Sequence, residues 1–160
     1  MIKILFVCHG NICRSPMAEF VLKDMVKKRG IEDRFYIASA ATSTEEIGNG
    51  VHYGTRNKLA QYSISVKGKR AVQLKKADYD NYDYIIGMDE WNMRNMLRIV
   101  RSDPEHKLYK LLDFSGSGRD VADPWYTGDF DVTYDDITEG CTALLDEISK
   151  GHKIEKRDTK

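Results

Sequence analysis

Features that mark membrane, secreted and nucleic-acid-binding proteins are scarce in this sequence. The first apolar run covers only residues 4–7, which is too short for a signal peptide or a membrane span. Three cysteines, an odd number, do not fit a secreted disulfide framework. The 25 basic and 25 acidic residues balance, so no overall field attracts nucleic acid, although a local basic patch remains compatible with this balance. We therefore expect a cytoplasmic protein that binds neither nucleic acid nor membrane.

Signatures of bound metals and cofactors are missing as well. The four histidines do not follow a metal-ligand spacing, and the twelve glycines form no nucleotide-binding pattern. We therefore expect no metal and no cofactor. The chain has 160 residues, no internal repeat and no linker, which predicts one domain over residues 1–150. Residues 151–160 are polar, and we expect them to form a flexible tail.

Strand and helix patterns alternate along the chain. Apolar runs predict strands over residues 3–8, 35–40, 84–88 and 108–112. Helical spacing predicts helices over residues 16–29, 55–62, 90–100 and 132–149, with a short turn at 75–79. Thr55 and Asp89 are the expected N-caps of two of these helices. This alternation indicates a parallel sheet with helices on both faces, whose ligands bind at the carboxyl ends of the strands.

The most informative segment is residues 8–15, CHGNICRS, which joins the first strand to a helix beginning near Pro16. A loop this short, turning into a helix, directs successive backbone N–H groups to one point and forms a nest for an anion. Gly10 and Asn11 tolerate the left-handed backbone that such a turn needs. Ser15 suits the N-cap, and Pro16 suits the first helical position.

The same loop places a thiol beside a guanidinium. A helix N-terminus and a nearby arginine both favour the thiolate form of a cysteine, so Cys8 is a candidate nucleophile. Arg14 offers a planar fork that matches two phosphate oxygens. The segment therefore indicates thiolate attack on a bound phosphorus. On the loop alone, any tetrahedral oxyanion, including arsenate, could be the substrate, and a buried structural cysteine remains the simpler alternative.

Residues 7–19, VCHGNICRSPMAE, resemble the signature of the low molecular weight protein tyrosine phosphatases. Residues 39–43 with 46–49, and the segment 123–126, resemble two further motifs of that family in the expected order. The resemblance spans roughly residues 2–150. It implies an α/β fold: a single three-layer, flavodoxin-like domain with a central four-stranded parallel sheet flanked by helices.

The resemblance also implies a role for each matched residue. Cys8 would be the nucleophile, Arg14 would bind phosphate, and Asp123 would act first as general acid and then as base. Trp125, which replaces a more usual Tyr, and Tyr126 would wall the substrate cleft. Ser39 and Ser43 would brace the phosphate-binding loop by hydrogen bonds. The remaining members of that loop would be His9, Gly10, Asn11, Ile12, Cys13 and Ser15.

Within the loop the resemblance assigns further duties. Asn11 would hold the loop in its curled form, and the Ser15 hydroxyl would hydrogen-bond the thiolate. Cys13 could form a reversible disulfide with Cys8. Two positions depart from the family pattern. His9 stands where small or aliphatic residues are usual, so it could contact substrate or alter the pH profile. Glu45 replaces an aromatic residue on the cleft rim, which should disfavour acidic phosphopeptides.

Three alternatives to a phosphotyrosine phosphatase follow from related loops. Arsenate reductases need a distal cysteine pair, whereas residues 78–90 contain no Cys, and Cys141 stands alone on an apolar helix face. Protein arginine phosphatases tend to carry Thr where Ile12 stands and lack the two aromatics after the acid. A non-catalytic phosphate-binding module would not need Asp123 with Cys8. The sequence thus favours a metal-independent enzyme, a monomer or weak dimer, that acts on phosphotyrosine proteins in a pathway it does not identify.

Overall fold

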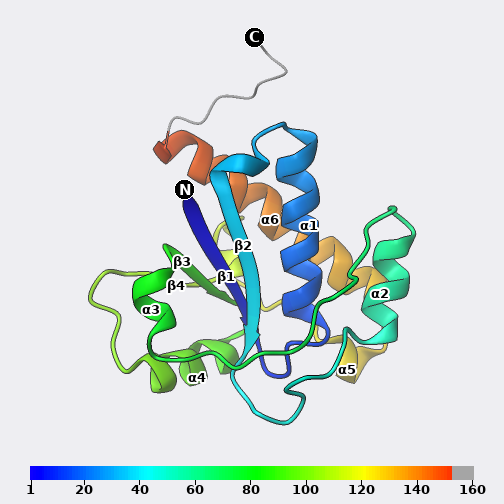
Figure 1. The fold of residues 1–160 in the computed structure, drawn as a ribbon, viewed down its shortest axis with the longest axis horizontal. Coiled ribbons are helices and arrows are strands. Elements are labelled where there is room, and N and C mark those ends of the chain that lie inside the picture. Colours follow the sequence, from blue (N-terminus) through cyan, green and yellow to red (C-terminus); the bar gives the residue numbers. More distant parts are fainter. Residues whose placement is uncertain (153–160) are drawn as a thin grey trace.

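A computed structural model describes residues 1–152 and contains a central sheet of four parallel strands (Figure 1). The strands are β1 (Ile2–Cys8), β2 (Phe35–Ala41), β3 (Tyr84–Gly87) and β4 (Leu108–Lys110), in the spatial order β2-β1-β3-β4. In the register, Cys8 pairs with Ala41 and Val7 pairs with Gly87, so β1, β2 and β3 end at the same edge. The predicted α/β fold with a four-stranded parallel sheet is confirmed.

Strand β1 lies at the centre and is covered on both faces. Ile4 and Phe6 belong to one core, packed against α1 (Arg14–Lys28) and α6 (Phe130–His152). Leu5 and Val7 point the other way into a second core, against α3 (Asp78–Asn81) and α4 (Glu90–Val100). Figure 1 shows α1 and α6 on one side of the sheet and α3 and α4 on the other. Burial on both faces explains the continuous apolar run of this strand.

Helix α6 closes the first core. Its predicted apolar face is buried along its full length, at Ile137, Cys141, Leu144, Leu145 and Ile148. The helix is longer than predicted and runs from Phe130 to His152. The first two residues of the predicted tail, 151–160, are therefore helical, and residues 153–160 lie outside the described part of the chain. Over residues 1–152, no helix combines the length and the apolar character that crossing a membrane requires.

Two of the three predicted helix caps are wrong, and tertiary contacts explain both. Helix α1 begins at Arg14, and Ser15 lies inside its first turn, where its hydroxyl contacts Cys8 and Asn11. Helix α2 (Tyr53–Ala60) is capped by His52, and Thr55 instead donates to the carbonyl of Cys13 at 3.1 Å. Both hydroxyls contact residues of the loop 8–15 and do not cap their own helices.

The other short elements differ slightly from the predicted ranges. Asp89 caps α4 as predicted, in a reciprocal capping box with Asn92. Strand β4 ends early because the chain tightens into the 3-10 turn η2 (Leu111–Asp113). A second 3-10 turn, η1 (Glu32–Arg34), leads into β2. After η2, the chain forms a one-turn helix, α5 (Pro124–Thr127), for which the sequence predicted no element.

Candidate active site

The loop of residues 8–15 wraps around the sulfur of Cys8. Backbone N–H groups of Asn11 and Ser15 donate to Sγ over 3.3 and 3.4 Å, and the Ser15 Oγ lies 3.1 Å from it. The sulfur also faces the N-terminal end of α1. Cys8 is buried, and these three groups are polar contacts of its sulfur. The arrangement places the sulfur against the amides of the anion nest.

Asn11 locks the curl of the loop. It adopts the left-handed backbone that the sequence predicted, with a φ of 58°, whereas Gly10 does not have a positive φ. The Asn11 Oδ1 accepts from the backbone N–H of Val72 at 3.1 Å, and its Nδ2 donates to Ser15 Oγ at 2.7 Å. Because Ser15 Oγ accepts this bond, its own hydrogen is free to donate to the sulfur of Cys8.

Gly10 has a steric function instead of a conformational one. A Cβ at this position would lie 3.3 Å from Cγ of Glu46, which is tight for a carbon contact. The absence of a side chain therefore lets the segment after β2 cover the loop.

Backbone contacts hold the outer side of the loop. The carbonyls of Cys8 and His9 each accept an N–H from the segment after β2. Ser43 takes part through its backbone N–H, which donates to His9, and not through its hydroxyl. Ser39 does not reach the loop at all, because its hydroxyl donates to Glu19 Oε1 at 2.5 Å. The resemblance therefore placed the right segment against the loop but the wrong atoms.

Arg14 is almost fully buried behind the nest, with its guanidinium fixed by three acceptors. Its Nη1 lies 2.9 Å from Asp89 Oδ2 and donates to the Val121 carbonyl at 3.1 Å. Its Nη2 lies 3.4 Å from Asp123 Oδ2. Burial lowers the pKa of Arg14, but the charges of Cys8, Asp123 and Asp89 outweigh it, so the pKa lies above its usual value. Arg14 is thus a permanent, oriented cation.

Asp123 lies beside the guanidinium of Arg14. It caps the one-turn helix α5, with its Oδ1 accepting the Trp125 N–H at 3.0 Å. Its other oxygen faces Arg14, and about a quarter of the side chain (28%) is exposed. The carboxyl is therefore held in place but remains reachable from the cleft.

A cleft of about 460 Å³ brings these groups together. All twelve predicted site residues except Asn11 and Ser15 line it, and those two support it from behind. Four lining residues were not predicted from the sequence as site residues: Glu46, Asp89, Trp91 and Asn92. Trp91 is 57% exposed, and Trp125 and Tyr126 are 67% and 85% exposed. Three aromatic side chains thus stand at the cleft without being needed by the core.

The rim of the cleft carries an exposed contact between His9 and Glu45. His9 Nε2 lies 3.0 Å from Glu45 Oε2, which joins the phosphate-binding loop to the segment after β2. Glu46 lies beside this pair and accepts from the side chain of Asn49 at 2.9 Å. Both departures from the family pattern therefore contact each other, and the rim on this side is acidic.

Cys13 also lies in the loop but in a different setting from Cys8. Burial, followed by the nearby charge of Cys8, raises the pKa of the Cys13 thiol to about 12. Cys13 is thus a neutral thiol at neutral pH.

Within residues 1–152, no three His, Cys, Asp or Glu side chains come together as a metal site would require.

Comparison with known proteins places this geometry in a family. Residues 3–154 match the model of the low molecular weight phosphotyrosine protein phosphatases. The low molecular weight protein-tyrosine-phosphatase YfkJ of Bacillus subtilis is 40% identical, over 96% of this chain and all of its own length. Its crystal structure superposes with a TM-score of 0.90, over 94% of this chain and 96% of that one.

Two further solved structures are similar. The low molecular weight protein tyrosine phosphatase SP-PTP of Streptococcus pyogenes is 40% identical with a TM-score of 0.86, covering 98% of this chain and 100% of that one. A Drosophila arginine phosphatase is 28% identical with a TM-score of 0.83, covering 91% and 97%. With full-length matches of this similarity, the protein is a phosphatase that belongs to the low molecular weight phosphotyrosine protein phosphatase family.

Proposed function

We propose that this protein hydrolyses phosphotyrosine in phosphoproteins through a phosphocysteine intermediate on Cys8. The observation that carries the proposal is the meeting of three groups in one cleft: the sulfur of Cys8, the guanidinium of Arg14 and the carboxyl of Asp123. A nucleophile, an anion clamp and an acid are what hydrolysis of a phosphate monoester requires.

Binding of the phosphate changes the partners of Arg14. Its Nη2 lies 3.4 Å from Asp123 Oδ2. A phosphate dianion seated on the loop amides competes for this guanidinium and brings negative charge toward the carboxylate. Asp89 keeps Nη1 of Arg14 in position during this exchange.

In the first chemical step, the thiolate of Cys8 attacks phosphorus and forms an S–P bond. The bond from phosphorus to the tyrosine oxygen breaks, and Asp123 gives its proton to that oxygen, so tyrosine leaves neutral. The loop amides and Arg14 hold the equatorial oxygens, where charge is stabilised in the transition state. The Ser15 hydroxyl, directed at the sulfur by Asn11, would stabilise the thiolate whenever sulfur carries the charge.

In the second step, water attacks the phosphocysteine. The carboxylate of Asp123 takes a proton from this water, the S–P bond breaks, and inorganic phosphate and the Cys8 thiolate are formed. Asp123 returns to its protonated state for the next turnover. No atom changes its oxidation state in either step, so the cycle needs no redox partner.

The aromatic side chains around the cleft support an aryl ester as substrate. Trp125 and Tyr126 follow the acid directly, and Trp91 lies at the start of α4. Exposed flat faces of this kind suit the ring of a phosphotyrosine more than a short alkyl phosphate. The apolar Ile12 in the loop is compatible with the same choice.

Phosphoarginine is the second candidate substrate, because one similar structure is that of an arginine phosphatase. Arsenate reduction is disfavoured, since the chain has only three cysteines and Cys141 is buried in the core. We expect hydrolysis of a phosphotyrosine peptide with a chelator present, loss of activity in Cys8→Ser, and little release of phosphate from phosphoarginine. Full activity of Cys8→Ser or faster hydrolysis of phosphoarginine would contradict the proposal.

A further inference from the structure

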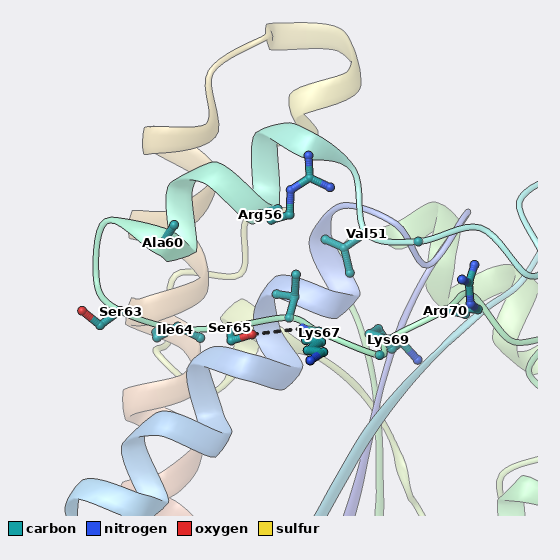
Figure 2. A pocket seen from close by; sticks show the side chains of 12 residues that line it. Val51, Arg56, Ala60, Ser63, Ile64, Ser65, Lys67, Lys69 and Arg70 are labelled. Carbon is teal, nitrogen blue, oxygen red and sulfur yellow. Dashed lines mark hydrogen bonds between the residues drawn. The ribbon is translucent and has the colours of Figure 1, made fainter.

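A second hollow, a groove of about 660 Å³, lies between α2 and the segment of residues 63–70 (Figure 2). Figure 2 shows Arg56 on α2 and Lys67, Lys69 and Arg70 on that segment. Val51, Ile64 and Val66 supply apolar surface between them. Within the described residues, no Asp or Glu lines this groove. Its lining is therefore apolar and basic, although the formal charges of the whole chain balance at 25 against 25.

Only one of the four cations is neutralised by a carboxylate. Lys69 is largely buried, donates to the Ser39 carbonyl at 2.8 Å and lies 3.7 Å from Glu19. Arg70 donates to the Gly48 carbonyl at 2.9 Å, which leaves its charge uncompensated. Arg56 and Lys67 are exposed and form no ion pair within residues 1–152. Three positive charges thus face the groove without a counter-charge.

The groove and the catalytic cleft lie close together, because the same two chain segments contribute to both or contact both. Glu46 lines the cleft and Gly50 lines the groove, and four residues of chain span at most about 14 Å. Gly50 forms an antiparallel bridge with Arg70. Two residues further on, Val72 donates to Asn11, the residue that fixes the phosphate-binding loop. A peptide with its phosphotyrosine in the cleft can therefore reach the groove within a few residues.

We propose that this groove binds an acidic segment of the phosphoprotein substrate, several residues away from the phosphotyrosine. The proposal rests on the phosphotyrosine phosphatase function proposed above. The two sites have opposite charge: Glu45 and Glu46 make one rim of the cleft acidic, whereas Arg56, Lys67 and Arg70 make the groove basic. The enzyme selects against acidic residues adjacent to the phosphotyrosine and for acidic residues that reach the groove.

Two phosphopeptides test this selection. They share the residues next to the phosphotyrosine, and one carries Asp and Glu at four to eight residues on each side where the other carries Asn and Gln. The enzymes are the wild-type chain, the groove variant Arg56→Gln/Lys67→Gln, and the matched control Lys27→Gln/Arg34→Gln. The control removes the same charges from exposed positions near the amino ends of the strands, away from the cleft.

For the wild type and the control we expect a KM about fivefold lower for the acidic peptide, with the same kcat. The groove variant retains Arg70, so its preference should fall to about twofold or less, with an unchanged kcat/KM for p-nitrophenyl phosphate. Raising the salt concentration should reduce the preference of the wild type. Equal KM values in the wild type, or an undiminished preference in the groove variant, would overturn the proposal.

A binding measurement separates this inference from the catalytic one. Fluorescence anisotropy with the acidic peptide in unphosphorylated form reports on the groove alone. Tighter binding to the wild type than to the groove variant supports the groove even if neither phosphopeptide is hydrolysed, in which case the proposed function has failed. Equal binding to both proteins counts against the groove whatever the activity is.

Discussion

The carboxylate of Asp89 lies 2.9 Å from the guanidinium of Arg14, and the same carboxylate caps helix α4. One oxygen, Oδ1, accepts the N–H of Asn92 at 2.7 Å, while Oδ2 faces Nη1 of Arg14. The capping bond therefore fixes the carboxylate of Asp89, and this carboxylate in turn fixes the guanidinium of Arg14. Asn92 returns the bond by accepting the N–H of Asp89 at 3.2 Å. A helix start thus orients the phosphate clamp.

Replacing Asp89 by Asn should separate these two functions. Asn caps a helix as well as Asp, so the thermal midpoint should change little. The charge-assisted bond to Arg14 is lost, and kcat/KM for an aryl phosphate should fall about tenfold. Steady-state kinetics and thermal unfolding on the same preparation check both expectations. An Asn variant with wild-type kcat/KM would show that Asp89 serves only the helix.

The acid role of Asp123 predicts a dependence on the leaving group. In Asp123→Asn the cap of α5 is retained, but no proton can be given to the leaving oxygen. The loss of kcat should approach about 10²–10⁴-fold for phosphotyrosine and be much smaller for p-nitrophenyl phosphate, whose leaving group needs little protonation. Equal losses for the two substrates would contradict general acid catalysis by this residue.

The fold and the central loop could be predicted because their information is local. The buried strand β1, the loop 8–15 and the start of α1 are contiguous, so one stretch of sequence contains the proposed nucleophile Cys8, the nest and Arg14. Pro124 and the two aromatics that follow favoured Asp123 only modestly over other acidic residues such as Asp120, and the family motif decided the prediction. The closing helix was predicted because its apolar spacing is regular and long.

Asp89 and Trp91 were missed because their place depends on sheet order. They become neighbours of the loop only because β3 lies beside β1, with Gly87 opposite Val7. The available signal was the position of Asp89 just after a strand, at the edge where ligands bind in parallel sheets. The predictions for Ser15 and Thr55 failed for the opposite reason. A local capping preference does not show that the Ser15 hydroxyl contacts Cys8 or that the Thr55 hydroxyl donates to the Cys13 carbonyl.

The raised pKa of Cys13 predicts that the folded protein loses thermal stability at alkaline pH. Its pKa is raised to about 12 in the folded protein, above an unfolded value of about 9, so the folded state holds this proton more tightly. The resulting stability is fully present below pH 9 and is lost as the pH rises toward 12. Thermal unfolding should therefore show a smaller drop in midpoint between pH 8 and 10.5 for Cys13→Ser than for the wild type.

The wild type and Cys13→Ser also share a drop in thermal midpoint that comes from other groups, and this shared drop serves as the control. Tyr82, whose pKa is also raised to about 12, mainly by burial, contributes to the drop in both. Identical midpoint losses in the wild type and Cys13→Ser would show that Cys13 does not titrate differently on folding.

We expect Trp91 to contribute to the binding of aryl substrates. In Trp91→Ala we expect the KM for a phosphotyrosine peptide to rise about fivefold, because one flat wall of the cleft is lost. Inhibition by inorganic phosphate, which has no ring, should be unchanged. If phosphate inhibition weakens as much as peptide binding does, Trp91 acts on the loop and not on the ring.

The contact between His9 and Glu45 predicts non-additive effects on peptide choice. His9→Gln removes the ring that contacts Glu45 and leaves this carboxylate free to face the substrate, so the KM should rise for a peptide with Asp beside its phosphotyrosine. Glu45→Gln should lower that KM about threefold, as expected for one exposed charge. In the Glu45→Gln background, His9→Gln should have little further effect, because the charge it would unmask is gone. A peptide with Asn in place of Asp provides the control, and its KM should hardly change in any variant. Additive effects of the two substitutions would mean that His9 contacts substrate by itself.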